Sequence, residues 1–502
     1  MKRKKYKNTA IALCTLMALA GCGAQASGEA SSVPDPSPSQ EAAVTTASTI
    51  DTSTIFSDRD LEGTYDESAA IAIQLSGDSA ACDSDAVTIE GSRITIGAEG
   101  VYVLSGTLAD GQIVVNAGET DKVQLVLAGA DITSSTSAAI YALEADKVFV
   151  TLAEGTENTL TNGGAYVAID DNNIDAVIFA KTDLTLNGSG SLTINAQAGH
   201  GVVSKDDLVI TGGSYTITAQ GDAVSAQGAL QIDSGTFDLH TGEGSASVDM
   251  TTSDVSQMGG SRGGMDAQTE VTATATEEDT VSQKGIKGES TYTINGGVFT
   301  IDSADDCLHA GGAMTLAAGE FTLSSGDDAV HCDDALTIQS GAFTIPYCYE
   351  GIEGLSITIE DGTFDITSSD DGLNAAGGTD SSGFGGFGGQ PQDTFTADSD
   401  SFITINGGTF TIVSSGDCID SNGALTINGG TLDLTCNGSG NTTMDCDGTY
   451  ANNGGNITTN DGSEVNPGQM GGGKGGAQSG GARQDGTNGG GRPDGQTLPA
   501  TS

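Results

Sequence analysis

Apolar and polar residues alternate in short bursts along most of the chain. In one stretch, Phe321 and Leu323 are followed by Val330 and then by Leu336 and Ile338, with Gly, Ser, Asp and Gln around the bursts. Alternation with period two is typical of β-strands, and the bursts lack the spacing of an amphipathic helix. The pattern therefore predicts three short strands in each unit.

The units repeat at a nearly constant distance. The pattern Gly-Gly-x-Phe-Thr-Ile returns about every 22 residues, the spacing of Phe321 and Phe343. Equivalent residues form one column: Tyr215, Phe237, Phe299, Phe321, Phe343, Phe364, Phe410 and Leu432. One unit cannot bury its apolar face alone, so successive units must stack. The sequence predicts an all-β fold over 61–455, a parallel β-helix (solenoid) with coils of roughly 22 residues.

Two spacings in the column are longer than the rest, and both coincide with a change in composition. They predict insertions at about 242–282 and 376–400, which we expect to be loops on one rim of the solenoid.

The two ends of the chain have different compositions from the repeats. Basic residues precede a short apolar run that ends in Leu19-Ala20-Gly21-Cys22, which resembles a lipobox. We expect a lipoprotein signal peptide at 1–21, with Cys22 lipid-modified and the protein extracellular, anchored to the bacterial cell membrane. Segments 22–60 and 456–502 lack core-forming residues and predict a disordered linker and a Gly-rich disordered tail.

The charge balance narrows the class of partner. The chain has 68 acidic and 17 basic residues and a formal net charge of −51. Nucleic acid is therefore excluded as an expected partner. So many carboxylates repel one another in a compact fold unless they are solvated or neutralised, so cations are expected.

Stacking converts positions in the repeat into columns on the surface, with neighbours ~4.8 Å apart. Seven residues after the Phe column stand Asp222, Lys284, Asp306, Asp328, Glu350, Asp371 and Asp417. Ten residues after it stand Ser225, Lys287, His309, His331, Glu353, Asn374 and Asp420. The ninth position is apolar throughout and must point inward.

Carboxylates at this spacing repel each other by about 1 kcal/mol in water and by more near a protein surface. Ca²⁺ binds six to eight hard oxygen ligands and tolerates irregular geometry, so we expect calcium on this stripe. The expected ligands are Asp305, Asp306, Asp327, Asp328, Glu350, Glu353, Asp370, Asp371, Asp417 and Asp420. The alternative is that Asp doublets only end strands and form turns.

Six further residues near the stripe are candidates for contact with carbohydrate: Lys284, Lys287, His309, His331, Tyr347 and Tyr349. The lysines would hold a sugar carboxylate or simply neutralise Asp306. The histidines would stack and bind a sugar hydroxyl or a transition metal, or be ordinary surface residues. The tyrosines would stack on a sugar ring or be structural.

Several runs on the stripe resemble a bacterial family of carbohydrate-binding domain-containing proteins, over about 60–450. They include Lys284-Gly285-Ile286-Lys287, Asp305-Asp306-Cys307-Leu308-His309, Asp327-Asp328-Ala329-Val330-His331, Tyr349-Glu350-Gly351-Ile352-Glu353-Gly354 and Asp370-Asp371-Gly372-Leu373-Asn374. The resemblance implies a right-handed β-helix similar to polysaccharide lyases, bound calcium, and affinity for cellulose and acidic, pectin-like polysaccharide such as polygalacturonate.

Three functional classes follow. The favoured one is a calcium-dependent carbohydrate-binding lipoprotein without enzymatic activity. The alternatives are a calcium-dependent polysaccharide lyase, in which a Lys or Arg abstracts a proton beside a uronate carboxylate, and a β-helical adhesin or stalk. Outside the first insertion, the stretch 160–456 has only Lys181, Lys205, Lys284 and Lys287 and no Arg. This scarcity of candidate bases favours binding over catalysis.

Overall fold

A computed structural model describes residues 56–164, 166–248, 282–376 and 400–467. The predicted signal peptide with Cys22, most of the predicted linker and tail, and most of both insertions lie outside the described residues. Within them, regular structure is almost entirely strand, apart from α1 (Asp58–Leu61) and two 3₁₀ turns, η2 (Ser245–Ser247) and η4 (Ser463–Val465). None of the described helices has the length and apolar character needed to cross a membrane.

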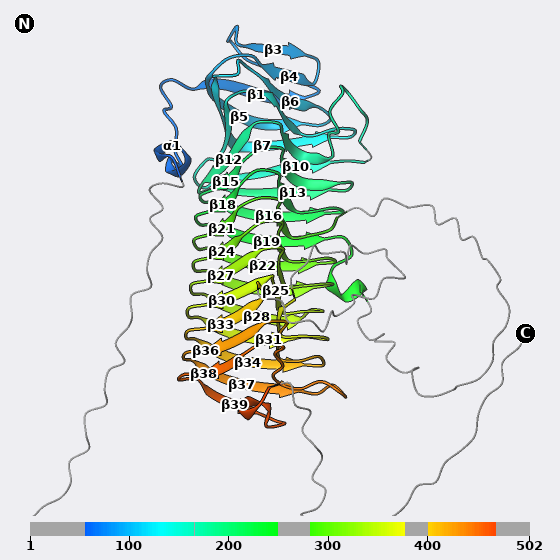
Figure 1. The fold of residues 1–502 in the computed structure, drawn as a ribbon. Helices are drawn as coiled ribbons and strands as arrows, with labels where there is room; N and C mark the ends of the chain where they lie inside the picture. The colour runs from blue at the N-terminus through cyan, green and yellow to red at the C-terminus, as the bar shows by residue number, and fades with distance from the viewer. Residues whose placement is uncertain (1–55, 165, 249–281, 377–399, 468–502) are drawn as a thin grey trace, which may run out of the picture. The chain divides into compact units, whose positions relative to one another are not determined.

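The strands form three columns (Figure 1). The first column is a 13-stranded sheet: β3 (Val87–Glu90), β4 (Arg93–Ile96), β6 (Gln112–Asn116), β8 (Ile140–Glu144), β11 (Ala176–Ala180), β14 (His200–Ser204), β17 (Val224–Ala226), β20 (Ile286–Gly288), β23 (Leu308–Ala310), β26 (Val330–Cys332), β29 (Ile352–Glu353), β32 (Leu373–Ala375) and β35 (Ile419–Ser421).

The other two columns belong to a 26-stranded sheet and are joined through the long strand β7. The second column contains β2 (Ser79–Ala81), β1 (Ile71–Gly77), β5 (Gly100–Leu108), β7 (Lys122–Ser134), β9 (Lys147–Leu152), β12 (Asp183–Gly188), β15 (Leu208–Ile210), β18 (Leu230–Ile232), β21 (Tyr292–Ile294), β24 (Met314–Leu316), β27 (Ala335–Ile338), β30 (Ser356–Ile359), β33 (Phe402–Ile405), β36 (Ala424–Ile427) and β38 (Tyr450–Asn452). The third contains β10 (Glu157–Asn162), β13 (Ser191–Ala196), β16 (Ser214–Ala219), β19 (Thr236–Thr241), β22 (Val298–Ser303), β25 (Glu320–Ser325), β28 (Ala342–Tyr347), β31 (Thr363–Thr367), β34 (Thr409–Ser414), β37 (Thr431–Cys436) and β39 (Asn456–Thr459).

Pairing between successive coils is parallel and in register. In the third column Phe299 pairs with Phe321, and Phe321 pairs with Phe343, as the 22-residue spacing requires. From β8 to β37 each coil thus contributes one strand to each column and stacks on the next. The predicted parallel β-helix is confirmed.

The first coils depart from uniform parallel stacking. β2 pairs antiparallel with β1, and β3 pairs antiparallel with β4, so an antiparallel strand terminates each sheet at this end. An open sheet edge exposes unpaired backbone groups that invite association with other chains. These hairpins act as the cap that a solenoid needs at its end.

The predicted Phe column is a continuous stack inside the solenoid. Adjacent rings from Tyr215 to Phe410 lie with centroids 4.5 to 5.3 Å apart. The glycine two positions before each ring has a left-handed backbone, with φ of +140° at Gly319 and +137° at Gly341. A Cβ on Gly319 would approach the Phe321 ring to 2.8 Å. The Gly-Gly-x-Phe motif therefore encodes a turn that the following ring covers.

Both predicted ends of the solenoid differ from the structure. Phe56 and Asp60, placed in the linker, are buried, and Asp60 pairs with Lys147 at 2.8 Å. At the other end, β39 continues the third column past residue 455, with Ile457 paired to Leu432. The reason is that Gly454-Gly455-Asn456-Ile457-Thr458 repeats the coil motif with Ile in place of Phe.

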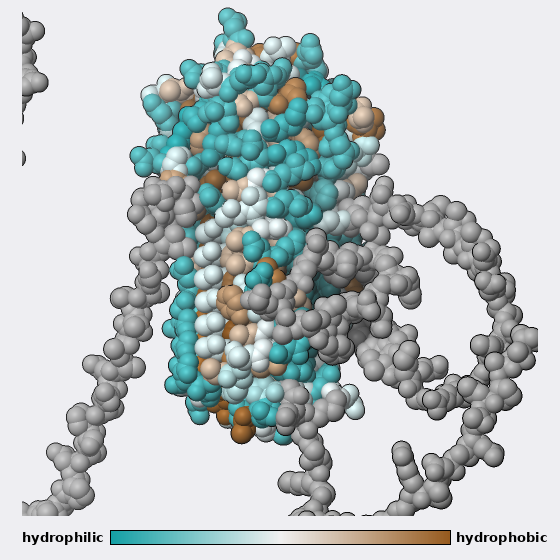
Figure 2. All heavy atoms as spheres, in the orientation of Figure 1, coloured by the Kyte–Doolittle hydropathy of each residue, from teal (hydrophilic) through white to brown (hydrophobic). Residues whose placement is uncertain are grey.

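The face seen in Figure 2 is mostly hydrophilic or of intermediate hydropathy. Beside the second column of strands, residues of similar hydropathy run in lines from coil to coil. Most buried apolar residues form one core that extends from Ile73 to Met444, and a second, smaller cluster around Tyr141 and Phe179 lies near the N-terminal end of the solenoid. Function must therefore be sought in polar columns on the outside of the coils.

Candidate functional site

The predicted polar columns lie on the 13-stranded sheet and on the turns that lead into its strands. From β17 to β35 the first residue of each strand points inward, as the fully buried Val330 and Ile352 illustrate. The second residue points outward, and the parallel pairing places His309 beside His331 and Glu353 beside Asn374. The predicted register is confirmed from Ser225 to Asp420.

Carboxylates at the seventh position hydrogen-bond to the backbone of the next coil. Asp222 Oδ1 accepts from the N–H of Lys284 at 2.8 Å, and Asp306 Oδ1 accepts from the N–H of Asp328 at 3.1 Å. Asp328 Oδ1 accepts from Glu350, and Asp371 Oδ1 accepts from Asp417. One oxygen of each of these side chains thus has the turn-forming role of the alternative interpretation. The second oxygen of Asp306 contacts Lys284, and that of Asp328 contacts His331.

At the upper end of the stripe, Lys284 is buried between two carboxylates. Its ammonium donates to Asp305 Oδ1 at 2.8 Å and to Asp306 Oδ2 at 2.6 Å, and its exposed fraction is 5%. Burial alone would raise the pKa of Asp306, but Lys284 and His309 outweigh burial and lower it. Burial and the neighbouring Asp306 raise the pKa of Asp305. This geometry favours the alternative in which Lys284 neutralises Asp306.

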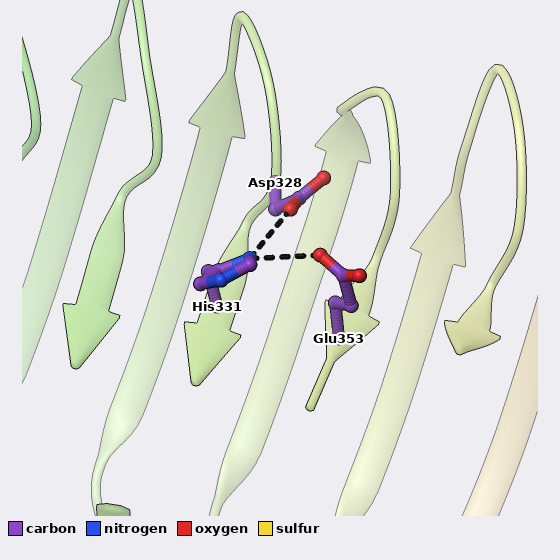
Figure 3. Close-up of side chains that lie close together, drawn as sticks. All are labelled: Asp328, His331 and Glu353. Carbon is purple, nitrogen blue, oxygen red and sulfur yellow. Dashed lines mark hydrogen bonds and ion pairs between the residues drawn. The ribbon is translucent and has the colours of Figure 1, made fainter. Parts of the chain in front are cut away.

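In the middle of the stripe, His331 faces two carboxylates with one nitrogen (Figure 3). Its Nδ1 lies 3.0 Å from Asp328 Oδ2 and 2.8 Å from Glu353 Oε2, while its Nε2 lies 3.1 Å from Asp333 Oδ1. Burial alone would lower the pKa of His331, but these carboxylates outweigh burial and raise it. The predicted stacking on His309 is confirmed, with ring centroids 5.0 Å apart.

The lower end of the stripe gathers acids around an amide. Asn374 donates through Nδ2 to Glu350 Oε2 at 2.8 Å, but its buried Oδ1 has no hydrogen-bond partner among the described residues. Burial, followed by Glu353 and Asp371, raises the pKa of Glu350 well above its usual range.

The same effect extends to the next coils. Burial, followed by Asp420 and Asp370, raises the pKa of Asp371 well above its usual range. Burial raises the pKa of Asp417 to about 7, although the backbone N–H of Thr442 opposes this shift. A nearby cation would therefore favour the ionised form of each of these side chains.

The remaining candidates lie at the margin of the stripe. Lys287 Nζ is 2.8 Å from Glu289 Oε1 rather than from Asp306. Tyr347 and Tyr349 are 36% and 38% exposed, and the Tyr347 hydroxyl donates to the Val248 carbonyl at 3.0 Å. Part of each ring surface therefore remains available to a ligand.

Two residues of the site were not predicted. Asp333 follows β26 by one residue, and an acidic residue beside His331 was the available signal. Asn374 was recognised as a member of the outward column but not as a ligand. Its unpaired oxygen depends on side-chain orientation, which no sequence pattern specifies.

Seven cysteines lie in the described residues, and all carry free thiols, including Cys436 and Cys446. Cys307, Cys332, Cys348 and Cys418 are buried, and a buried free thiol packs like a small apolar side chain.

Comparison with known proteins gives a family and two relatives. The family model described as carbohydrate-binding domain-containing protein matches residues 90–261, 241–329 and 327–471. A carbohydrate-binding domain-containing protein of Acetivibrio thermocellus is 40% identical over 137 residues. That match covers 27% of this chain and 48% of the relative, so the similarity spans about half of the relative's length.

One solved structure is also similar, a polysaccharide lyase-like protein from C. thermocellum determined as a gadolinium derivative. The match has 21% identity and a TM-score of 0.30, and it covers 78% of this chain and 94% of that one.

Proposed function

Since the chain belongs to the family of carbohydrate-binding domain-containing proteins, we propose that it is a non-catalytic, calcium-dependent polysaccharide-binding protein. Its calcium ions bind to the lower part of the acidic stripe and connect it to acidic, pectin-like polysaccharide such as polygalacturonate, while cellulose binds without the ion. The proposed site comprises Glu350, Asp370, Asp371, Asn374, Asp417 and Asp420.

The observation that carries the proposal is a column of partly buried carboxylates around an unpaired amide oxygen. Glu350 and Asp371 both have pKa values raised by burial and by neighbouring acids. The buried Asn374 Oδ1 lacks a donor among the described residues. The sequence contains no Lys or Arg from 288 to 473, so these coils contribute no Lys or Arg of their own to the region.

The donor set fits calcium. Carboxylate and amide oxygens are the hard ligands that Ca²⁺ prefers, and successive coils present them at a spacing suited to shared ligation. Glu350, Asp371 and Asn374 would hold the ion, which when bound would supply a positive charge for a sugar carboxylate. Calcium keeps variable coordination, so a ligand carboxylate can complete its shell.

Two observations favour binding over a lyase reaction. A lyase base must lose its proton and reach the substrate. The ammonium of Lys284, the candidate base nearest the stripe, is instead buried between Asp305 and Asp306. Lys287, the next candidate, forms an ion pair with Glu289.

The cell-surface location is part of the proposal and rests on the sequence Leu19-Ala20-Gly21-Cys22. Lipid attached to Cys22 would hold the protein to the outer surface of the bacterial membrane. The variant Cys22→Ala should release the protein to the medium or leave it unprocessed, which fractionation and mass measurement would detect. Unchanged membrane association of that variant would contradict a lipid anchor.

The central test measures binding to polygalacturonate and to cellulose, each with millimolar calcium and with a chelator. Glu350→Gln combined with Asp371→Asn should weaken calcium-dependent polygalacturonate binding at least tenfold, about 1.4 kcal/mol. Asp365→Asn combined with Asp433→Asn removes two exposed carboxylates elsewhere and is the matched control. Polygalacturonate binding that does not depend on calcium, or equal losses of this binding in both double variants, would contradict the proposal.

The same samples separate the alternatives. A calcium-dependent rise in ultraviolet absorbance from unsaturated uronate would identify a lyase, and its loss in Lys284→Ala would identify the base. Calcium binding without affinity for either polysaccharide would instead indicate an adhesin or stalk.

A further inference from the structure

We propose that Asp328, His331 and Glu353 form a second metal site, specific for a transition-metal ion such as Zn²⁺ or Co²⁺ rather than for calcium. Asp328 lies on the turn before β26, His331 on β26 and Glu353 on β29 (Figure 3). It does not depend on polysaccharide binding, because a chain that binds no sugar would still present these ligands.

The three ligand atoms converge on one point. Nδ1 of His331 lies 3.0 Å from Asp328 Oδ2 and 2.8 Å from Glu353 Oε2, and all three atoms lie within 4.8 Å of one another. Bonds of about 2.0 to 2.2 Å to one ion place adjacent ligand atoms at roughly 3 Å. The two separations from Nδ1 therefore match those of adjacent ligands on one metal ion, and the third lies within the 4.8 Å limit.

A protonated His331 would attract both carboxylates, but a hydrogen bond from Nδ1 accounts for only one of the two contacts. One imidazole nitrogen carries at most one hydrogen, so Nδ1 cannot donate a full hydrogen bond to two carboxylates at once. The two carboxylates also repel each other across the ring nitrogen. A divalent cation offsets the repulsion between the carboxylates and accepts a lone pair from each of the three ligand atoms.

The second nitrogen of His331 has the partner that metal-bound histidines usually have. Nε2 lies 3.1 Å from Asp333 Oδ1. An N–H to carboxylate contact on the far side of the ring fixes the tautomer and leaves Nδ1 as a lone-pair donor. This makes Asp333 a positioning residue rather than a ligand.

The site is largely buried and is accessible to solvent beside Glu353. His331 is 2% and Asp328 is 3% exposed, and stacking on His309 fixes the ring plane at an interplanar angle of 8°. The side chain of Glu353 retains 21% exposure, which gives an ion a route from solvent. A preformed, partly open donor set of this kind requires little rearrangement on binding.

The donor chemistry selects the class of ion. Imidazole nitrogen suits zinc, cobalt, nickel and copper, whereas calcium prefers a shell made of oxygen atoms alone. His309 does not form an equivalent group, because the Oδ2 atom of its neighbour Asp306 already pairs with Lys284 Nζ at 2.6 Å. The column therefore has an ammonium at its upper end, a nitrogen-containing site in the middle and oxygen ligands below.

The test uses full-length protein stripped with a chelator and titrated with CoCl₂ in millimolar calcium. We expect a visible ligand-field absorption that saturates near one cobalt per chain and is displaced by zinc. His331→Gln should weaken cobalt binding by about 100-fold or more, and Asp333→Asn by about 10- to 100-fold, the usual cost of losing an outer partner. His309→Gln, which changes the adjacent ring of the same column, should keep the absorption.

Circular dichroism establishes whether each variant is folded. If His331→Gln does not fold, Glu353→Gln replaces it as the ligand variant. The proposal is overturned if the wild type shows no cobalt absorption, if millimolar calcium abolishes it, or if it persists in both ligand variants. Failure of polysaccharide binding with cobalt binding intact would reject only the proposed function.

Discussion

Phe343 shows how a single position of the repeat supports the core. Its ring lies 4.5 Å from that of Phe321 and 5.0 Å from that of Phe364, measured between centroids. We predict that Phe343→Ala lowers the free energy of unfolding by about 3 to 5 kcal/mol, because it leaves a cavity in a stack that cannot collapse. Urea unfolding followed by circular dichroism measures the change.

Thr344→Ala is the control for this prediction, because Thr344 is the exposed neighbour on the same strand. Its effect should stay within about 0.5 kcal/mol. Equal effects of the two substitutions would mean that the ring stack contributes little to stability.

At the residue scale, the sequence correctly predicted the positions of side chains that recur in every coil. The column from Tyr215 to Leu432 and the inward ninth position follow from counting, since parallel stacking preserves register. The sequence did not predict contacts that depend on the conformation of a long or polar side chain. Neither the burial of the Lys284 ammonium between two acids nor the unpaired oxygen of Asn374 could be read from spacing.

At the scale of elements, α1 docks beside β9 and β12 through one carboxylate. Asp60 pairs with Lys147 at 2.8 Å and accepts from the Thr185 hydroxyl at 2.6 Å. Burial would raise the pKa of Asp60, but Lys147, Ser57 and Thr185 outweigh it and lower the pKa to about 2. A lowered pKa in the folded state stabilises the protein above the unfolded value of about 3.9.

We therefore predict that Asp60→Asn lowers the free energy of unfolding at pH 7 by roughly 2 to 3 kcal/mol. The difference should shrink as pH falls from about 4 to about 2, because the wild-type carboxylate then becomes protonated. Denaturant unfolding at several pH values measures it. Asp58→Asn, on the exposed side of α1, should show no such dependence, and a constant difference for Asp60→Asn would refute the assignment.

Element boundaries were less predictable than the repeat itself. The composition of the segment before 61 gives no periodic signal, and the docking of α1 rests on long-range contacts between Asp60 and residues more than 80 positions away. The antiparallel hairpins at β1–β2 and β3–β4 were also missed, because strand alternation does not distinguish parallel from antiparallel pairing. The last strand, in contrast, carried the coil motif and was predictable.

At the scale of the whole molecule, stacking repeats an acidic residue in coil after coil, within a chain whose formal net charge is −51. A solenoid adds the interactions between neighbouring coils, so repulsion between adjacent carboxylates accumulates along the stripe. An ion that binds only the folded chain offsets this repulsion by mass action, by about 2.7 kcal/mol at a concentration 100 times its Kd.

We predict that chelation lowers the melting temperature of the wild type by several degrees relative to millimolar calcium. Glu350→Gln combined with Asp371→Asn removes both ligands and two repelling charges. The chelated double variant should therefore melt above the chelated wild type and respond little to calcium. Added monovalent salt should raise the melting temperature of the chelated wild type, because it screens the remaining charges.

Differential scanning calorimetry tests all of these outcomes, and equal melting temperatures with calcium and with chelator would reject calcium binding on the stripe. If the double variant instead melts below the chelated wild type, the carboxylates stabilise the coils mainly as acceptors of backbone hydrogen bonds.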